Sequence, residues 1–346
     1  MIDAQATRTF TDPRIEMAHG AGGKASRRLV EGLFAPLFGD PLPLALTDAA
    51  PLEIDGIRLA LTADGFVVRP LRFPGGSIGE LAVNGTVNDL AVSGARPLAL
   101  LATFVIEAGT ASQVVEDEAR AMAAAAARAG VRVVGGDTKV VEHGKADGLY
   151  ITTAGVGRVD ARVRVDAASV RPGDRVLLSG PIGDHGVTVM LARGAIELEA
   201  AICSDTRSVW PLVEALVDAA APGLRWMRDP TRGGVATALN ELAREARVGI
   251  AIHEELIPVR DPVRGACELL GLDPLHIANE GQFLAVVAPD MADAALDAVR
   301  RAPGGEAAAL VGDVREDSRG MVLAVAAYGT SRVVDMLVGD PLPRIC

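Results

Sequence analysis

The chain has 346 residues, of which 49% are hydrophobic and only 3% aromatic, and its formal net charge is −11. The negative charge argues against a nucleic-acid-binding surface, which needs clustered Lys and Arg to displace counterions. No stretch of about 18 apolar residues without charge occurs, and residues 1–17 lack an apolar signal core, so we expect a cytoplasmic protein that does not enter a membrane.

The first half of the chain alternates predicted strands and helices. A Gly-rich turn at residues 20–24 begins an expected helix over 25–38 and is a possible anion cradle. Ser77 followed by Glu80 three residues later predicts a capping box, and Gly94 predicts the end of that helix. The other expected elements are strands at 57–62, 65–68, 98–106, 131–134 and 150–156, and a helix at 111–129.

A Pro/Gly turn at residues 170–174 is the best candidate boundary between two domains, which a chain of this length favours. Beyond it we expect strands at 175–178, 283–287 and 321–327, a helix from 187, and a helix at 235–247. Strands mixed with Ala-rich helices in both halves predict an α/β or α+β fold. The predicted organisation is a flexible arm at 1–14, an N-terminal domain at 15–169, a C-terminal α/β domain at 170–335 and a flexible tail at 336–346.

The last residue is a cysteine, and the chain has only two others, Cys203 and Cys267. Their spacing indicates neither a disulfide framework nor a zinc site. Pro341 and Pro343 remove two N–H donors, so the tail should leave the body in an extended conformation. A thiol at a fraying chain end serves a core poorly, which predicts a chemical use for Cys346; the alternative is an inert tail.

Carboxylates recur at the ends of predicted strands, in Gly-rich loops and in one apolar helix. Mg²⁺ takes oxygen ligands of this kind together with phosphates, although each aspartate alone could be a simple turn former. Asp89 differs because it follows Asn84 and Asn88 within an apolar helix, where polar side chains need partners. The candidate metal ligands are Asp48, Asp64, Asp89, Asp137 and Asp229.

Three further residues have two interpretations each. Lys139 follows residues 136–138 of a Gly-rich segment and could contact a phosphate, or could be a surface lysine. Glu280 precedes a predicted strand and could be a general base, or could sit in a solvated turn. His185 could orient a group, or could be a packing residue. The segment at 20–24 is not a Walker A loop, because the glycine five positions earlier is missing.

Several segments together carry a family resemblance. They are HGAGGK at 19–24, TADGFVVRPLRFPGG at 62–76, NGTVNDLAVSGA at 84–95, GGDTKVVEHGKADG at 135–148, GPIGDHG at 180–186, MRDPTRGG at 227–234, ANEGQ at 278–282 and the terminal PLPRIC. With these segments the chain resembles the HypE family of hydrogenase-maturation proteins, within the PurM-like ATP-binding enzymes. The terminal PLPRIC separates HypE from the wider group, which includes thiamine-monophosphate kinase and selenophosphate synthetase.

The resemblance implies a two-domain PurM-like fold and a homodimer whose N-terminal domains pair their sheets. It also implies that ATP binds between the domains of a chain. The carbamoyltransferase HypF would load Cys346 with a carbamoyl group, which this enzyme would dehydrate to a thiocyanate. The cyanide would then pass to iron on a HypC–HypD scaffold and become a ligand of NiFe-hydrogenase.

The resemblance also implies roles for single residues. Cys346, Glu280 and Lys139 would be the catalytic residues, and the five aspartates would bind Mg²⁺. The expected ATP contacts are Gly22, Gly23, Lys24, Asp64, Asn88, Asp89, Gly136, Asp137, Thr138 and Lys139. Two alternatives stay open: a PurM-like ATP-dependent enzyme that acts on a small free substrate, and a non-catalytic carrier that presents Cys346.

Overall fold

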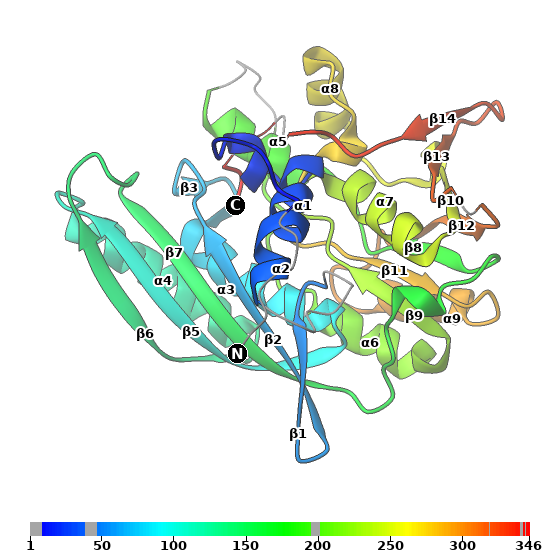
Figure 1. Cartoon of the computed structure of the whole chain (residues 1–346), viewed down its shortest axis with the longest axis horizontal. Helices are drawn as coiled ribbons and strands as arrows, with labels where there is room; N and C mark the ends of the chain where they lie inside the picture. Colours follow the sequence, from blue (N-terminus) through cyan, green and yellow to red (C-terminus); the bar gives the residue numbers. More distant parts are fainter. Residues whose placement is uncertain (1–8, 39–46, 195–200, 318, 340–341, 343) are drawn as a thin grey trace.

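The structure, a computed structural model, describes residues 9–38, 47–194, 201–317, 319–339, 342 and 344–346. Two sheets, each with its own helices, lie side by side (Figure 1). The two-domain α/β fold predicted from the sequence is confirmed. Among the described residues, no helix is both long and apolar enough to cross a bilayer.

The N-terminal half is built around a five-stranded sheet in the order β1-β2-β7-β5-β6. The elements are the 3-10 helix η1 (Met17–Gly20), α1 (Lys24–Leu29), the π-helical η2 (Val30–Phe34), α2 (Ala35–Phe38), β1 (Ala50–Ile54), β2 (Ile57–Phe66), β3 (Arg72–Phe73), β4 (Gly76–Ser77), α3 (Ile78–Val92), β5 (Ala95–Glu107), α4 (Ser112–Arg128), β6 (Arg132–Val141) and β7 (Leu149–Val159). Among the described strands of this sheet, only the β5–β6 pair is parallel.

Helix α3 occupies the covered face of this sheet, and every one of its residues except Glu80 and Asp89 is buried. The predicted capping box is wrong. Glu80 forms an ion pair with Arg128 at 2.5 Å, and the backbone N–H of Gly79 donates to the buried Glu118 carboxylate of α4 at 3.0 Å. A side chain of the neighbouring helix α4 therefore accepts the hydrogen bond of a backbone N–H in the first turn of α3. Its predicted end at Gly94, which has φ +72°, is confirmed.

Two predicted strand boundaries are wrong, and both errors concern candidate site residues. The expected strands at 57–62 and 65–68 belong to one strand, β2, and Asp64 lies near the end of this strand. The expected strand at 131–134 continues as β6 to Val141, so Asp137 and Lys139 lie within a strand and not in a loop. In both cases backbone pairing with the neighbouring strand overrides the weak strand propensity of Gly and Asp.

The C-terminal half has a seven-stranded mixed sheet in the order β14-β13-β10-β12-β8-β11-β9. Its elements are η3 (Ala167–Ser169), β8 (Arg175–Leu178), α5 (Asp184–Ala192), α6 (Trp210–Ala220), η4 (Ala221–Gly223), β9 (Leu224–Arg228), α7 (Gly234–Ala246), β10 (Gly249–His253), η5 (Glu254–Leu256), α8 (Asp261–Leu270), η6 (Pro274–His276), β11 (Leu284–Val287), α9 (Ala292–Arg301), β12 (Ala309–Arg315), β13 (Val322–Val325) and β14 (Ser331–Val334). One apolar core lies between the sheet and α7, and another between the sheet and α6 with α9.

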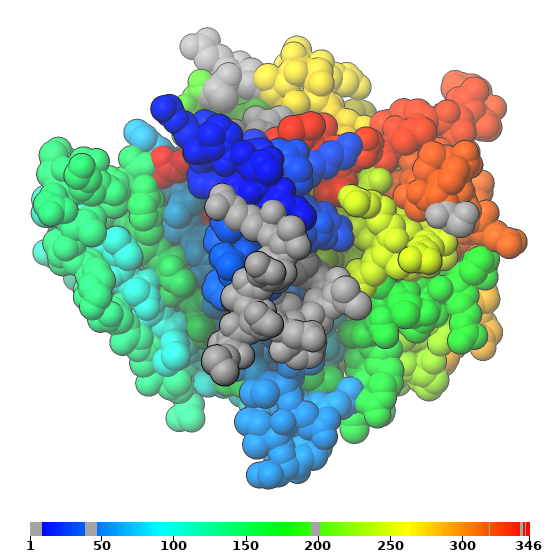
Figure 2. All heavy atoms as spheres, viewed as in Figure 1, coloured from blue at the N-terminus to red at the C-terminus, as the bar shows by residue number. Residues whose placement is uncertain are grey.

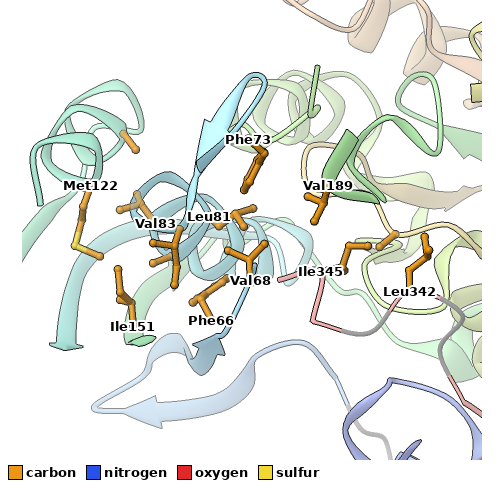
Figure 3. Close-up of a cluster of buried hydrophobic side chains, with 14 of the residues drawn as sticks. Phe66, Val68, Phe73, Leu81, Val83, Met122, Ile151, Val189, Leu342 and Ile345 are labelled. Atoms are coloured by element: carbon orange, nitrogen blue, oxygen red, sulfur yellow. The ribbon is translucent and has the colours of Figure 1, made fainter. Parts of the chain in front are cut away.

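The last residues of the chain pack into a third core, which joins the two halves. Ile345 is 1% exposed, and Figure 3 shows it beside Val68, with Val189 and Leu342 around it. From the two prolines we expected the tail to leave the body. This expectation is wrong for the described part of the tail, which packs against the body. The apolar side chains of Leu342 and Ile345 supply the burial that this expectation left out.

The N-terminal segment also packs onto the body where it is described. Residues 1–8 of the predicted flexible arm lie outside the described residues, whereas Phe10 is buried and its backbone N–H donates to the carbonyl oxygen of Gly32. Figure 2 shows this blue segment overlying part of the red C-terminal segment on the face in view. Lys24 makes that contact through its backbone N–H, which lies 3.1 Å from the Leu337 carbonyl oxygen.

Candidate active site

Three aspartates from distant parts of the chain converge where the two domains meet. Asp48 precedes β1, Asp89 lies near the end of α3, and Asp229 directly follows β9. Each can offer one carboxylate oxygen such that all three oxygens lie within 4.8 Å of one another. Oxygen ligands at this spacing suit a hard divalent cation.

Asp64 and Glu280 face the same region. Asp64 is in register with Thr153 of β7, on the sheet face that α3 covers. A Cβ placed on Gly85 of α3 would lie 3.7 Å from Asp64 Oδ2, so this carboxylate lies against the helix one turn before Asp89. Glu280 is 3% exposed, and its Oε1 has no hydrogen-bond partner among the described residues.

The shared burial shifts the acidity of these groups. Burial raises the pKa of Asp48 to about 6, and the neighbouring Glu241 and Asp64 add to the rise. Burial raises the pKa values of Asp89 and Asp229 well above the ordinary range, and the nearby carboxylates add to both rises. The pKa of Glu280 rises in the same way, through burial first and then through Asp229. A bound cation would relieve the mutual repulsion of these carboxylates. Their oxygens are the kind of ligand that Mg²⁺ takes, so the residues present fit this ion.

Two arginines border the acidic cluster. Arg228 Nε lies 3.0 Å from Asp48 Oδ1, and its Nη2 lies 3.1 Å from Glu241. Burial raises the pKa values of Asp64 and Glu280, and Arg232 offsets part of both rises. Arg232 Nη1 also donates to the carbonyl oxygen of Gly20. Sequence reasoning missed both arginines as site residues, although each belongs to the MRDPTRGG segment.

The Gly-rich turn at residues 20–24 lies beside Arg232. Gly22 has φ +79°, and a Cβ there would lie 2.6 Å from Arg232 Cβ, so only glycine fits. Gly22 and Gly23 line a small hollow of about 170 Å³ together with Asp229 and Arg232. Lys24 is engaged elsewhere, because its Nζ forms an ion pair with Asp335 at 2.6 Å.

A larger cavity opens next to Asp48, between the β1–β2 hairpin and the C-terminal domain. Its volume is about 780 Å³, and its lining includes Asp48, Arg164, Trp226 and Arg228. This volume lies within the range of small-molecule sites.

Asn88 supports Glu280 rather than facing the acidic cluster. Its Nδ2 donates to the carbonyl oxygens of Glu280 and Arg207, at 3.1 and 3.0 Å, and its Oδ1 accepts from the backbone N–H of Val209. The expected direct contact of Asn88 with ATP stays a prediction.

The segment from Gly136 to Lys139 is not brought to this site within one chain. Strand β6 is the edge of its sheet, and it is exposed along its length up to Val140. Asp137 is in register with Thr103 and Lys139 with Val105, on the sheet face opposite to α3. Lys139 Nζ lies 2.6 Å from Asp137, and hydrogen bonds from Lys139 and from the Thr138 backbone lower the Asp137 pKa.

Cys346 docks where β2 ends. Its carbonyl oxygen accepts from the backbone N–H of Val67 at 3.0 Å, three residues after Asp64. The buried His185 holds the preceding residue, because its Nε2 lies 2.8 Å from the Ile345 carbonyl oxygen. Cys346 itself is partly buried against the core that joins the domains.

Comparisons with known proteins agree with this arrangement. Residues 46–159 match the family model described as "AIR synthase related protein, N-terminal domain", and residues 171–324 match the model described as "AIR synthase related protein, C-terminal domain". The carbamoyl dehydratase HypE of Rhizobium leguminosarum bv. viciae is 49% identical over 96% of this chain and 95% of its own length. The carbamoyl dehydratase HypE of Escherichia coli strain K12 is 42% identical over 96% of this chain and 99% of its own length.

Solved structures give the same result. A crystal structure of the hydrogenase maturation protein HypE in complex with ATP has a TM-score of 0.80 and 41% identity, and it covers 96% of this chain and 100% of its own. A crystal structure of a HypE–HypF complex has a TM-score of 0.85 and 43% identity, over 89% of this chain and 99% of its own. The chain therefore belongs to the HypE family of carbamoyl dehydratases, which act in hydrogenase maturation.

Proposed function

We propose that this carbamoyl dehydratase carries its substrate on its own C-terminal cysteine. The carbamoyl group on Cys346 Sγ would be dehydrated to a thiocyanate at the expense of ATP. The observation that carries the proposal is the position of the tail. Cys346 is hydrogen-bonded to the backbone of Val67, directly after the strand that presents Asp64 to the acidic cluster. A substrate fixed to this chain end would need no separate binding site.

The reaction balances as S–C(=O)NH₂ plus ATP giving S–C≡N, ADP, phosphate and a proton. Oxide is a poor leaving group, so the phosphoryl group supplied by ATP would turn the carbamoyl oxygen into phosphate, which leaves with the C–O electron pair. Both N–H protons are lost in the process. Glu280 is our candidate base, because its Oε1 is buried and has no hydrogen-bond partner among the described residues.

Four aspartates at the domain junction would hold the metal and the phosphates. Asp48, Asp89 and Asp229 offer three oxygens within 4.8 Å, and Asp64 lies against the same helix. Mg²⁺ would supply charge neutralisation there. The hollow lined by Gly22 and Gly23 adjoins this cluster, and the relative of known structure binds ATP, which supports a nucleotide at the junction of the two domains.

The strand β6 supports a homodimer. Its backbone edge is unpaired among the described strands, and its open face continues into Leu101, which is 48% exposed. Pairing of two N-terminal sheets would cover this surface. Asp137 and Lys139 could then serve the partner's site, although they lie apart from the site of their own chain.

Two further partners complete the proposal. The solved HypE–HypF complex supports HypF as the protein that delivers the carbamoyl group to this chain. The thiocyanate would then be the cyanide donor for iron on a HypC–HypD scaffold. This step rests on the family relationship.

Mass spectrometry of the terminal peptide tests the central step. Cleavage before Asp340 releases the peptide that ends in Cys346. After incubation with the carbamoyltransferase, carbamoyl phosphate, ATP and Mg²⁺, we expect this peptide to gain a carbamoyl group and then lose one water. Cys346→Ala should keep its fold and its ATP binding but show neither change. A carbamoylated peptide that never loses water with ATP present would identify the chain as a carrier.

A second variant tests the docked tail. Residues added after Cys346 should prevent dehydration, because Cys346 is partly buried against the core that joins the domains and its docked position leaves little room for more residues. Normal dehydration with a bulky C-terminal extension would contradict the docked position.

A further inference from the structure

One short segment between α5 and α6, residues 204–207, contacts both His185, which holds the tail, and the loop that carries Glu280. At its first residue, Ser204 Oγ lies 2.8 Å from His185 Nδ1, and His185 Nε2 lies 2.8 Å from the Ile345 carbonyl oxygen. A carbonyl can only accept, so Nε2 carries the proton and Nδ1 accepts from the Ser204 hydroxyl. The Ser204 hydroxyl thus fixes the ring that holds the tail.

The next residue of the segment holds Glu280. Asp205 Oδ1 accepts from the backbone N–H of Glu280 at 3.1 Å, and Oδ2 accepts from that of Gly281 at 3.3 Å. Arg207 Nε donates to the Gly281 carbonyl oxygen at 2.9 Å. The backbone on both sides of Glu280 is therefore tied to this segment.

These contacts are enclosed. His185 is fully buried, Glu280 is 3% exposed, and the ring of Phe73 packs edge-on against His185. A buried N–H that loses its acceptor is costly, so His185 should not keep its position when the Ile345 carbonyl leaves. Ser204 would follow the ring, and Asp205 is joined to it by a planar peptide bond.

We propose that the Ser204–Asp205 pair couples docking of the C-terminal tail to the placement of Glu280. This inference rests on the proposed function, in which Cys346 carries the substrate and Glu280 is the base. Ser204, His185 and Asp205 are positioning residues: the first two act through the tail, and the third acts through the Glu280 backbone. Glu280 would thereby be held in position for catalysis only when the tail that carries the substrate is docked.

The test compares two serines of the same loop. Ser204→Ala removes the hydroxyl that meets His185. Ser208→Ala is the matched control, because Ser208 Oγ accepts from the backbone N–H of Trp210 at the start of α6. Ser204→Thr restores a hydroxyl. Cyanate would carbamoylate Cys346 directly, so that addition of Mg²⁺ and ATP starts dehydration without the carbamoyltransferase. The released terminal peptide reports the water loss.

For Ser204→Ala we expect the maximal rate of dehydration to fall by roughly 10-fold to 10²-fold, as for a small misplacement of reacting groups. The ATP concentration at half-maximal rate should stay unchanged. Alkylation of unmodified Cys346 by iodoacetamide should become faster, because the tail undocks more often. Ser204→Thr should recover both rates, and Ser208→Ala should match the parent in both.

Asp205→Asn separates coupling from local anchoring. It replaces one of the two acceptors beside Glu280 and does not touch the tail. Coupling is reciprocal, so this variant should also speed Cys346 alkylation. Slower dehydration with parental alkylation would overturn the inference, as would a Ser204→Ala protein that behaves like Ser208→Ala. Thermal melting of each variant checks that the fold is retained.

The same experiment keeps the two proposals apart. A parental protein that never loses water refutes the proposed function, whatever the alkylation rates are. A second outcome would refute only the coupling. In it, the parental protein dehydrates the tail, Glu280→Gln does not, and Ser204→Ala dehydrates the tail at the parental rate.

Discussion

The aspartates at the domain junction and the aspartate on edge strand β6 carry the same side chain in opposite environments. Asp48, Asp89 and Asp229 lie together, and burial raises their pKa values. Asp137 is exposed, and hydrogen bonds from Lys139 and the Thr138 backbone lower its pKa. The junction gathers repelling charges at a cost in stability, while the edge strand keeps its charges solvated.

The largest expected effect is at Glu280, on the buried side of the comparison. Glu280→Gln keeps the shape of the side chain but removes the carboxylate, so dehydration of a carbamoylated tail should slow by roughly 10²–10⁴-fold. Peptide mass spectrometry measures the rate, with ATP binding checked in parallel. A parental rate would move the search for the base to Lys139 or an ordered water. His185 is a poor alternative, because its two ring nitrogens contact Ser204 and Ile345.

Asp89→Asn should weaken binding and strengthen the fold. Loss of one anionic ligand should lower the Mg²⁺–ATP affinity by more than about 10-fold, judged from the effect of ligand-supporting residues in metal sites. Removal of one charge from a repelling cluster should stabilise the metal-free protein by about 1 kcal/mol. Calorimetric titration and thermal melting measure the two effects. Asp137→Asn is the matched control for stability, since its exposed carboxylate repels no buried neighbour. An unchanged affinity for Asp89→Asn would reject the metal assignment.

Mixing these two variants sharpens the comparison. If each site uses the junction of one chain and β6 of the other, a dimer of Asp89→Asn with Asp137→Asn keeps one intact site. An equal mixture in which subunits exchange should then recover roughly a quarter of the parental activity from two inactive variants, because half of the dimers are mixed. If both residues acted in the same chain, no activity would return. Denaturation and joint refolding provide the exchange, and each variant refolded alone is the control.

The smallest expected effect is the pH dependence of stability without metal. The folded-state pKa of Asp48 is raised to about 6, so its favourable contribution is present below the ordinary pKa and is lost as the pH rises through 6. Asp48→Asn should therefore gain stability relative to the parent as the pH rises from about 4 to about 6, by less than about 3 kcal/mol, and keep that gain at higher pH. Asp137→Asn should show no such trend, because a lowered pKa has its effect at lower pH. Thermal melting with chelator present measures both.

Part of the site could be predicted from residue type and local pattern. Asp89 could be recognised because a carboxylate within an apolar helix needs a polar partner. Asp229 could be recognised because it lies in a Gly-rich segment after a strand. Local reasoning failed where pairing decided the outcome: it placed Asp64 and Asp137 in loops, although neighbouring strands hold both in β2 and β6. It also missed α6, α8 and α9, although α8 begins with Asp261 and Pro262 and ends at Gly271, which has φ +66°.

The sequence by itself determined the fold class, the family and the identity of the chemical groups, because these depend on residue types in a fixed order. The tertiary structure alone decided which aspartates meet. Asp48, Asp89 and Asp229 are far apart in the chain, and only the packing of the two domains brings their oxygens together. It also decided the fate of the tail: local rules for proline predict an extended end, but the burial of Ile345 and its hydrogen bond to His185 depend on surfaces that exist only in the folded protein.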